Sequence, residues 1–427
     1  QALHLNIYLT IILMILNTMW KTAYNSSQHF PLSVIVLPIF LTMIGLLALF
    51  SISVNQFGVI AITPFTKQLL FMIPAIGGFL VVLFIPKYIM HKYIYFAYGL
   101  IIILVATPFL LSTIAGTHRW INIGLPVAFQ PSEFAKWIVV VSLAKYLSDH
   151  NLEINKFSTL IFPILIALFP AIIILQQPDL GTSLILLTPV FPMLYWVGSK
   201  PFHLFILLAP IFSIGTAFHN ISFTSWAIIM GLIIYFSRPS LIFGIILYFV
   251  NIFLGLLAPL LWNGLRPYQQ KRILTLFNPE LDPLGAAYQT IQSKVAIGSG
   301  GFFGKGIGGG TQTHLKFLPV QESDFIISVI GEEFGYVTIA LMLILFFIFI
   351  IKIINLAFSS NERFAGLVLI GIATIFLSHV FVNTAMSTGL IPVKGLPLPF
   401  ISAGGSFLLS CYVMVSLIIK MGVEPIE

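Results

Sequence analysis

Charged side chains are scarce in this chain. Only 8% of its 427 residues are Asp, Glu, Lys or Arg, whereas 59% are hydrophobic. A soluble domain carries about 25% charged residues. A chain so poor in charge lacks the polar side chains needed to cover its surface in water, which excludes a soluble globular protein and a disordered one.

Cysteine is nearly absent: the chain contains one, Cys411. A single thiol cannot form an intrachain disulfide, and its surroundings suggest neither a metal site nor thiol chemistry. The formal net charge of +7 reflects the bias of basic residues in the loops of a membrane protein before it indicates nucleic acid, so no nucleic-acid partner is expected.

Long uninterrupted apolar runs are abundant. An outer-membrane barrel is excluded, because its segments alternate in polarity over about 10 residues. The runs predict an all-α polytopic membrane protein with about twelve spans, of which 223–236 is shorter than the ~20 residues that a full span needs. The predicted spans are 33–53, 69–85, 93–111, 131–147, 157–175, 181–197, 202–218, 223–236, 241–261, 325–354, 364–385 and 400–419.

The first 32 residues form a separate N-terminal segment. Its apolar stretch from Leu5 to Trp20 is short and is followed by Lys21. A signal-like segment, a true span and an interfacial helix all fit this pattern. Residues 33–427 are expected to form a single transmembrane domain.

The basic residues of the short loops predict the orientation. Because cytoplasmic loops are enriched in Lys and Arg, the richer side is taken as cytoplasmic. Alternate sides carry Lys21, Lys87, Lys92, Lys145, Lys156, Lys200, Arg238, Lys352, Arg363 and Lys420 against Lys67, Arg119 and Lys394.

The segment 262–324 then faces outward, and it is the most polar part of the chain. It breaks the charge trend, since it contains Arg266, Lys271, Arg272, Lys294, Lys305 and Lys316. An anionic partner at the outer leaflet is the simplest reason for these cations. A helix-like stretch (286–297) and a glycine cluster (298–310) predict an ordered cap over the bundle.

Few carboxylates lie inside the apolar runs. Glu133 and Lys136 are three residues apart and so share a helix face, where they form either a structural ion pair or the charged wall of a cavity. The preceding Arg119 and Trp120 fit an interfacial anchor as well as a ligand contact.

Asp282 is the strongest candidate for chemistry in the outward segment. Its Asp-Pro sequence is typical of a turn, which would explain the residue structurally. Yet Arg266, Lys271, Arg272 and Lys294 precede or follow it, and such cations would keep a carboxylate ionised and could hold a diphosphate. This combination suits a general base next to an anionic leaving group.

Other polar residues give weaker indications. The glycine cluster lacks the Walker A pattern, so its glycines are expected to permit tight turns while Lys305 lends a charge. Asp324 is expected on the same helix as Glu332 and Glu333, which lie about 12 Å deeper and could line a cavity or pair with Lys136. The histidines have no metal-ligand spacing.

Several motifs resemble, in order, those of the SEDS family (shape, elongation, division and sporulation), the membrane peptidoglycan glycosyltransferases typified by RodA and FtsW. The likeness covers about residues 37–420, and the stretch from Gln292 looks more like the elongation branch, RodA, than FtsW. The matching stretches are 119–124, 130–136, 177–183, 282–289, 292–301, 317–319, 324–326, 331–335 and 397–402.

The resemblance implies polymerisation of lipid II into β-1,4 glycan strands at the outer leaflet of the bacterial inner membrane, with release of undecaprenyl diphosphate. It places the essential family aspartate, which would activate the acceptor 4-hydroxyl, on Asp282. It also implies a class B penicillin-binding protein as partner, besides membrane lipid. No cofactor is certain, and Mg²⁺ or Mn²⁺ stays open. The residues it assigns to substrate binding are Arg119, Trp120, Glu133, Lys136, Arg272, Lys294, Lys305, Asp324 and Ser402.

The chain departs from the family pattern in places. The pattern has ten spans, so 202–236 reads as an extra helix pair, which preserves the sidedness of Asp282. Ser402-Ala-Gly-Gly405 replaces the familiar Ser-Tyr-Gly-Gly. Two other functions stay open: a flippase that moves lipid II along a polar path containing Glu133 and Lys136, and a scaffold for cell-wall assembly without chemistry.

Overall fold

A computed structural model describes residues 31–54, 63–112, 117–122, 128–149, 157–315 and 317–423. The prediction for the N-terminal segment falls outside these residues, apart from its last two positions. Lys156 and Lys316, which enter the charge argument, also lie outside them.

The described chain is mainly helical with almost no strand, as predicted. The strands among the described residues are two short antiparallel ones, β1 (Ile121–Asn122) and β2 (Ala128–Phe129). The first helices are α2 (Leu32–Ser53), α3 (Pro64–Phe84), α4 (Lys87–Ala106), α5 (Pro131–Asp149), α6 (Ile161–Gln176), α7 (Leu180–Leu187), α8 (Val190–Trp196), α9 (Pro201–Thr216), α10 (Asn220–Ser237) and α11 (Leu241–Leu256). They are followed by α12 (Ala258–Asn263), α13 (Pro267–Phe277), α14 (Tyr288–Gly300), α15 (Thr311–His314), α16 (Ile326–Ser359), α17 (Arg363–Ser387) and α18 (Gly405–Val423). Short 3₁₀ turns are η2 (Thr107–Leu110), η3 (Phe157–Leu160) and η4 (Pro279–Leu281).

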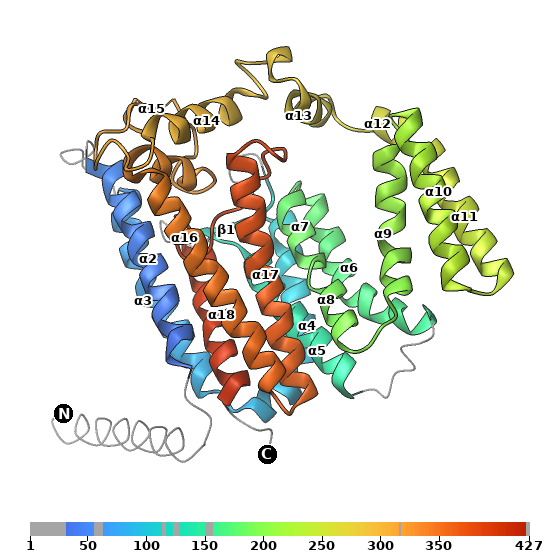
Figure 1. The fold of residues 1–427 in the computed structure, drawn as a ribbon. Helices are drawn as coiled ribbons and strands as arrows, with labels where there is room; N and C mark the ends of the chain where they lie inside the picture. The colour runs from blue at the N-terminus through green and yellow to red at the C-terminus, as the bar shows by residue number, and fades with distance from the viewer. Residues whose placement is uncertain are drawn as a thin grey trace.

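The helices form a multi-pass membrane bundle with a cap at one end (Figure 1). Seven described helices are long and apolar enough to span a bilayer, and shorter apolar helices accompany them. We call residues 264–325, which contain α13, α14 and α15, the cap, and the end of the bundle that they cover the cap side. The predicted ordered segment is therefore confirmed as structured, and its predicted helix corresponds to α14.

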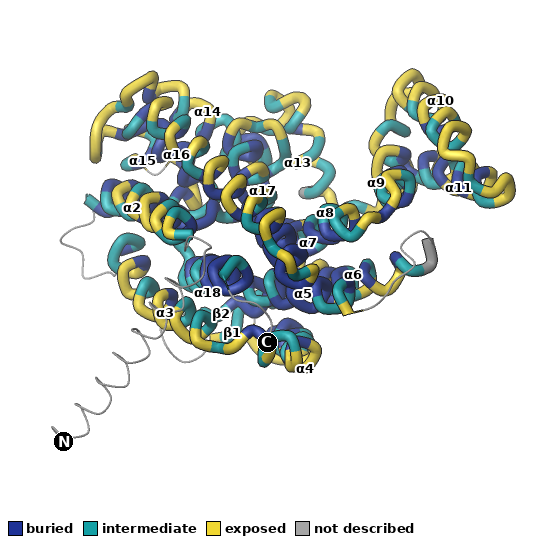
Figure 2. The backbone as a smooth tube through the Cα atoms, turned by 60° about the horizontal axis from the view of Figure 1, so that its bottom comes forward, coloured by how far each residue is buried: buried dark blue, intermediate teal, exposed yellow. Residues whose placement is uncertain are grey.

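Burial separates the centre of the bundle from its lipid-facing rim. The most apolar windows of α17 and α18 are 72% and 78% buried, whereas that of α10 is only 6% buried. α5 packs against α4, α6 and α17 and is buried along most of its length, as Figure 2 shows. Its charged residues are therefore enclosed by protein and do not face lipid.

Two predicted spans are interrupted. The span 181–197 divides into α7 and α8 next to Pro189, and 241–261 divides into α11 and α12 just before Pro259. Proline removes a backbone donor and clashes with the preceding turn, which breaks the helix. The first residues of the span 400–419 are irregular, and α18 begins only at Gly405.

Helices α9, α10 and α11 stand to one side of the bundle (Figure 1). α10 contains the predicted short span 223–236 and extends it at both ends. A polar chain joins the three helices, because Trp226 donates to Ser213 at 2.8 Å and Ser213 donates to Asn251 at 3.2 Å. Such paired polar groups hold helices together in an apolar surrounding.

Helix α16 is broken at Gly335, whose φ of 81° is left-handed. The break leaves carbonyl oxygens and N–H groups without helical partners, and the glycine cluster supplies replacements. Lys305 and Gly306 donate to the carbonyls of Glu332 and Glu333 at 3.0 and 2.9 Å, while Tyr336 donates to Gly301 at 2.9 Å. Backbone that is irregular near a membrane must be paired within the protein in this way.

The close approach of this loop requires glycine at particular positions. A Cβ at Gly300 would lie 1.9 Å from the carbonyl oxygen of Gly331 on α16. A Cβ at Gly298, an exposed residue of the same helix α14, would meet nothing within 4 Å. The glycine cluster therefore allows close packing against α16, which the sequence did not predict, while the positive φ of Gly304 and Gly306 fits the tight turns that it did predict.

We predict that Gly300→Ala destabilises the protein by about 1–3 kcal/mol, because the added methyl group overpacks a backbone contact. Thermal unfolding of the purified protein in detergent measures the effect. Gly298→Ala is the matched control and should leave the midpoint unchanged or slightly higher, since alanine favours helix. Equal effects of the two substitutions would contradict this account of the α14–α16 contact.

Candidate active site

Asp282 lies in the cap directly after η4. Its backbone oxygen accepts from the N–H groups of Gly285 and Ala287, and its Oδ2 accepts from the Ala286 N–H at 3.1 Å. The residue therefore makes the predicted turn. Its side chain is still 28% exposed and lines an open pocket of about 410 Å³, which we call the aspartate pocket. The turn therefore fixes the position of the carboxylate, which can still accept further hydrogen bonds.

Two cations from α13 line the aspartate pocket with Asp282. Lys271 Nζ lies 3.7 Å from Asp282 Oδ2 and is 65% exposed, so this ion pair is loose and solvated. Arg272 donates to the carbonyl oxygen of Val393 at 3.2 Å, which fixes its guanidinium between the cap and the loop joining α17 to α18. Of the four basic residues that the sequence placed around this carboxylate, Lys271 and Arg272 line its pocket, whereas Lys294 lines another pocket and Arg266 is not among the lining residues.

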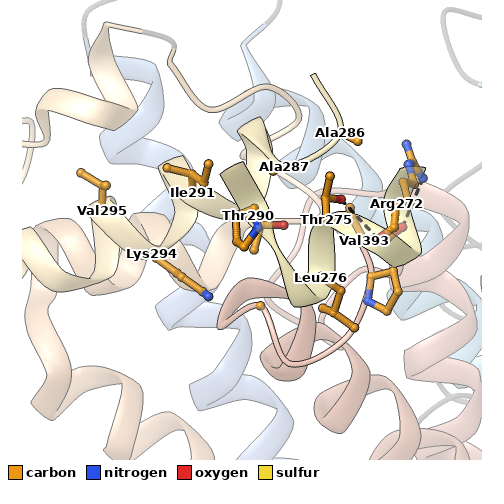
Figure 3. Close-up of a pocket in the computed structure, with 13 residues that line it drawn as sticks. Arg272, Thr275, Leu276, Ala286, Ala287, Thr290, Ile291, Lys294, Val295 and Val393 are labelled. Carbon is orange, nitrogen blue, oxygen red and sulfur yellow. Dashed lines mark hydrogen bonds between the residues drawn. The ribbon is translucent and has the colours of Figure 1, made fainter. Parts of the chain in front are cut away.

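A second pocket, of about 180 Å³, lies between α13, α14 and the loop after α17, and we call it the lysine pocket. Figure 3 shows Arg272 and Lys294 at it, on α13 and α14, together with apolar side chains. Arg272 therefore lines both pockets.

A third cavity, of about 130 Å³, lies between the ends of the bundle helices on the cap side, and we call it the polar cavity. It is lined by Arg119, Trp120, Glu133 and Asp324 among others, so the structure brings four of the predicted residues together. Arg119 Nε donates to the Gln177 carbonyl at 3.2 Å, and its Nη2 donates to the Pro178 carbonyl. Trp120 and Arg119 therefore form a cavity wall.

Lys136 lies behind this cavity, with a side chain that is fully buried. Its Nζ is 2.6 Å from Glu133 Oε2 and 3.0 Å from His379 Nε2, and it stands 4.9 Å from the centre of the Phe407 ring. The predicted pairing of Glu133 with Lys136 on one helix face is confirmed. The alternative that Glu332 or Glu333 pairs with Lys136 is wrong, because Glu332 binds Lys305 and Glu333 binds His314.

Asp324 lies in the turn before α16, at the rim of the polar cavity, and not on the helix of Glu332 as expected. Its Oδ1 accepts from Ser323 Oγ at 3.0 Å. Burial raises the pKa of Asp324 to about 6, although the Ser323 hydrogen bond and the Arg119 charge lower it; Glu322 and Asp179 add to the increase. The carboxyl group therefore holds its proton more tightly than an exposed aspartate.

Two other predicted substrate-binding residues are tied to the protein itself. Ser402 accepts from the Leu398 N–H at 2.9 Å and donates to the Ser323 carbonyl, which shapes the loop before α18. Lys305 Nζ lies 2.9 Å from Glu332 Oε1. Glu332 also accepts from the N–H groups of Gln312 and Thr313, so the first turn of α15 holds this carboxylate.

Sequence reasoning did not select several residues that line the polar cavity. Asp179 accepts from Gln130 Nε2 at 3.3 Å and from Thr182 Oγ1 at 2.9 Å, and all three residues line the cavity with Ser406. Their motifs, 130–136 and 177–183, were noted, but no chemical argument singled out these members. The described residues contain no group of three or more His, Cys, Asp or Glu arranged for a metal ion.

We predict that Lys136→Met and Glu133→Gln each destabilise the protein by about 3–5 kcal/mol, because each leaves a buried partner unpaired. The double variant should cost less than the sum of the two. Unfolding in detergent measures all three, with Lys352→Met, at an exposed position of α16, as the control. Additive losses would show that the pair does not act as a unit.

We predict that protein stability falls as the pH rises from about 4 to about 6, with a contribution of up to about 3 kcal/mol from Asp324. The sign follows from the raised folded-state pKa: in this window the folded protein binds more protons than the unfolded chain. Asp324→Asn removes that contribution. Unfolding midpoints of both proteins across the window provide the test, and identical slopes would refute it.

Comparison with known proteins gives the family. The profile of the family described as "Cell cycle protein", which covers FtsW, RodA and SpoVE, matches residues 31–227 and 221–425. Among curated relatives, the peptidoglycan glycosyltransferase RodA of Treponema pallidum is 30% identical over 423 residues, which cover 90% of this chain and 96% of the relative. The peptidoglycan glycosyltransferase MrdB of Escherichia coli K12 is 35% identical over 72% of each chain.

Solved structures share the fold. A chain from a structure titled for the coordination of polymerization and crosslinking by a peptidoglycan synthase complex has a TM-score of 0.67 and 24% identity, and the match covers 92% of this chain and 97% of that one. The crystal structure of Thermus thermophilus RodA gives 0.60 at 20% identity, covering 93% and 97%. The chain belongs to the FtsW, RodA and SpoVE family, the SEDS family that its sequence motifs resemble.

Proposed function

We propose that this chain is a peptidoglycan glycosyltransferase of the elongation type, which polymerises lipid II into glycan strands. Relatives that bear this activity in their names support the reaction class. The observation that carries the proposal is the aspartate pocket, where a turn holds the Asp282 carboxylate beside Lys271 and Arg272. Transfer from a diphosphate-linked sugar requires a base for the acceptor hydroxyl and cations near enough to receive the leaving diphosphate, and Arg272 lines this pocket as well as the lysine pocket.

The reaction then follows from these groups. Asp282 takes the proton of the acceptor 4-hydroxyl as its oxygen attacks the anomeric carbon of the donor sugar. The new glycosidic bond forms while the bond from that carbon to the diphosphate oxygen breaks. Undecaprenyl diphosphate leaves with the bonding electrons, and cations of the cap stabilise the charge that develops on it.

The cap side is proposed to be extracytoplasmic in the bacterial inner membrane. The short loops on the opposite side carry most of the basic residues, and the concentration of cations in the cap is the exception that an anionic substrate explains. A class B penicillin-binding protein is the proposed partner. A fold neighbour that comes from a peptidoglycan synthase complex supports this assignment.

The geometry favours a polymerase over a flippase. A path for a lipid headgroup would need polar side chains that stay open to water through the bundle. Lys136 is instead closed off by Glu133, His379 and the Phe407 ring. The aspartate pocket, in contrast, has no use in transport.

We predict that Asp282→Asn lowers lipid II polymerisation by about 10²–10⁴-fold, the usual contribution of a positioned base. The assay uses the purified chain with its partner and follows glycan products on gels. Glu280→Gln, an exposed carboxylate of the same loop, is the control and should retain activity. Polymer formation at the wild-type rate by the Asp282 variant would remove the base assignment, and lipid II flipping without any polymer would favour the transporter.

A further inference from the structure

The reaction joins two lipid-linked sugars, so the protein needs two places for them. In a displacement at a saturated carbon, the nucleophile and the leaving group lie on opposite sides of that carbon. A base that serves the nucleophile therefore cannot also lie next to the leaving diphosphate. If Asp282 is the base, the cations that receive the diphosphate must be sought beyond it.

The lysine pocket has the composition for an anionic group attached to an apolar chain. Arg272 and Lys294 line it, and no carboxylate is among its lining residues. Leu276, Ile291 and Val295 provide apolar side chains around the same space (Figure 3). The aspartate pocket differs, because its cations share the space with the Asp282 carboxylate.

Lys294 is available to a ligand, unlike Lys305 and Lys136. Among the described residues, its ammonium forms no hydrogen bond or ion pair, whereas Lys305 is bound to Glu332 and Lys136 to Glu133. Its position depends on Gly389 at the end of α17, where a Cβ would lie 2.7 Å from Lys294 Nζ and φ is +74°. The left-handed backbone and the missing side chain leave room for the lysine.

Arg272 connects the two pockets. Its guanidinium is fixed by the Val393 carbonyl, and the residue lines both spaces. Lys394, in the loop between α17 and α18, adds a further cation near Arg272. Its pKa is lowered by burial and, to a smaller extent, by the charge of Arg272. A group held in the lysine pocket thus lies next to the aspartate pocket, across one arginine.

We infer that the lysine pocket is the donor subsite, in which Lys294 and Arg272 bind the departing prenyl diphosphate and Leu276, Ile291 and Val295 contact its first isoprene units. The aspartate pocket is then the acceptor subsite. This inference rests on the proposed function, to which it adds the separation of donor and acceptor.

The test measures binding of farnesyl diphosphate, a short prenyl diphosphate, to the purified full chain in nanodiscs. Lys294→Gln should weaken binding at least about tenfold, because a charge-assisted contact is lost. Lys294→Arg should restore most of it, and Gly389→Ala should weaken it by displacing the lysine. Asp282→Asn should bind within about twofold of wild type. Inorganic pyrophosphate should bind more weakly than the prenyl compound.

The outcomes separate the two proposals, since binding needs no turnover. Unchanged affinity in Lys294→Gln, or a loss confined to Asp282→Asn, would overturn the donor subsite even if the chain polymerises lipid II. If inorganic pyrophosphate and farnesyl diphosphate bound with equal affinity, the proposed contact with the isoprene units would be refuted. Conversely, binding that depends on Lys294 in a chain that makes no polymer would retain the subsite and refute the polymerase.

Discussion

Lys136 is the largest side chain that the described bundle buries completely, so its ammonium group is shielded from bulk solvent. Glu133, His379 and the face of Phe407 surround it instead. A charge in the bilayer is costly unless it is paired, so these helices are held in one arrangement around that ammonium. The break in α16 obeys the same rule, because the glycine cluster pairs its free backbone groups. Pairing of polar groups therefore fixes both the wall of the polar cavity and the attachment of the cap.

The loop between α17 and α18 joins these two regions. Gly389 and Val393 line the lysine pocket, while Gly395 and Pro397, a few residues later, line the polar cavity. Asn383 holds the loop from α17 by donating to the Leu396 carbonyl at 2.7 Å. The proposed chemistry of the cap thus rests on the ordered centre of the bundle. The bundle is therefore the rigid support, and the cap carries the exposed charged groups.

Much of this arrangement follows from the sequence, because apolar runs, turn residues and i,i+3 spacing act locally. They predicted the spans, the turn at Asp282 and the pairing of Glu133 with Lys136. Contacts between distant segments were not predictable in this way. Lys305 looked like a ligand contact, yet it pairs with Glu332, which is 27 positions away. Asp179 was overlooked because its role depends on Gln130, from another part of the chain. The break of α16 at Gly335 was also not predictable, because the hydrogen-bond partners of its free backbone groups come from the glycine cluster, which precedes α16 in the chain.

The account depends on the cap being outside the cell. The substitution Leu284→Cys places a thiol beside the aspartate pocket at a position that is 87% exposed, whereas the natural Cys411 is buried. Asn361→Cys marks the exposed turn between α16 and α17 on the opposite side. In intact cells, with the outer membrane permeabilised where one is present, a membrane-impermeant maleimide should label residue 284 and leave residue 361 unlabelled. Labelling of residue 361 with protection of residue 284 would contradict the account.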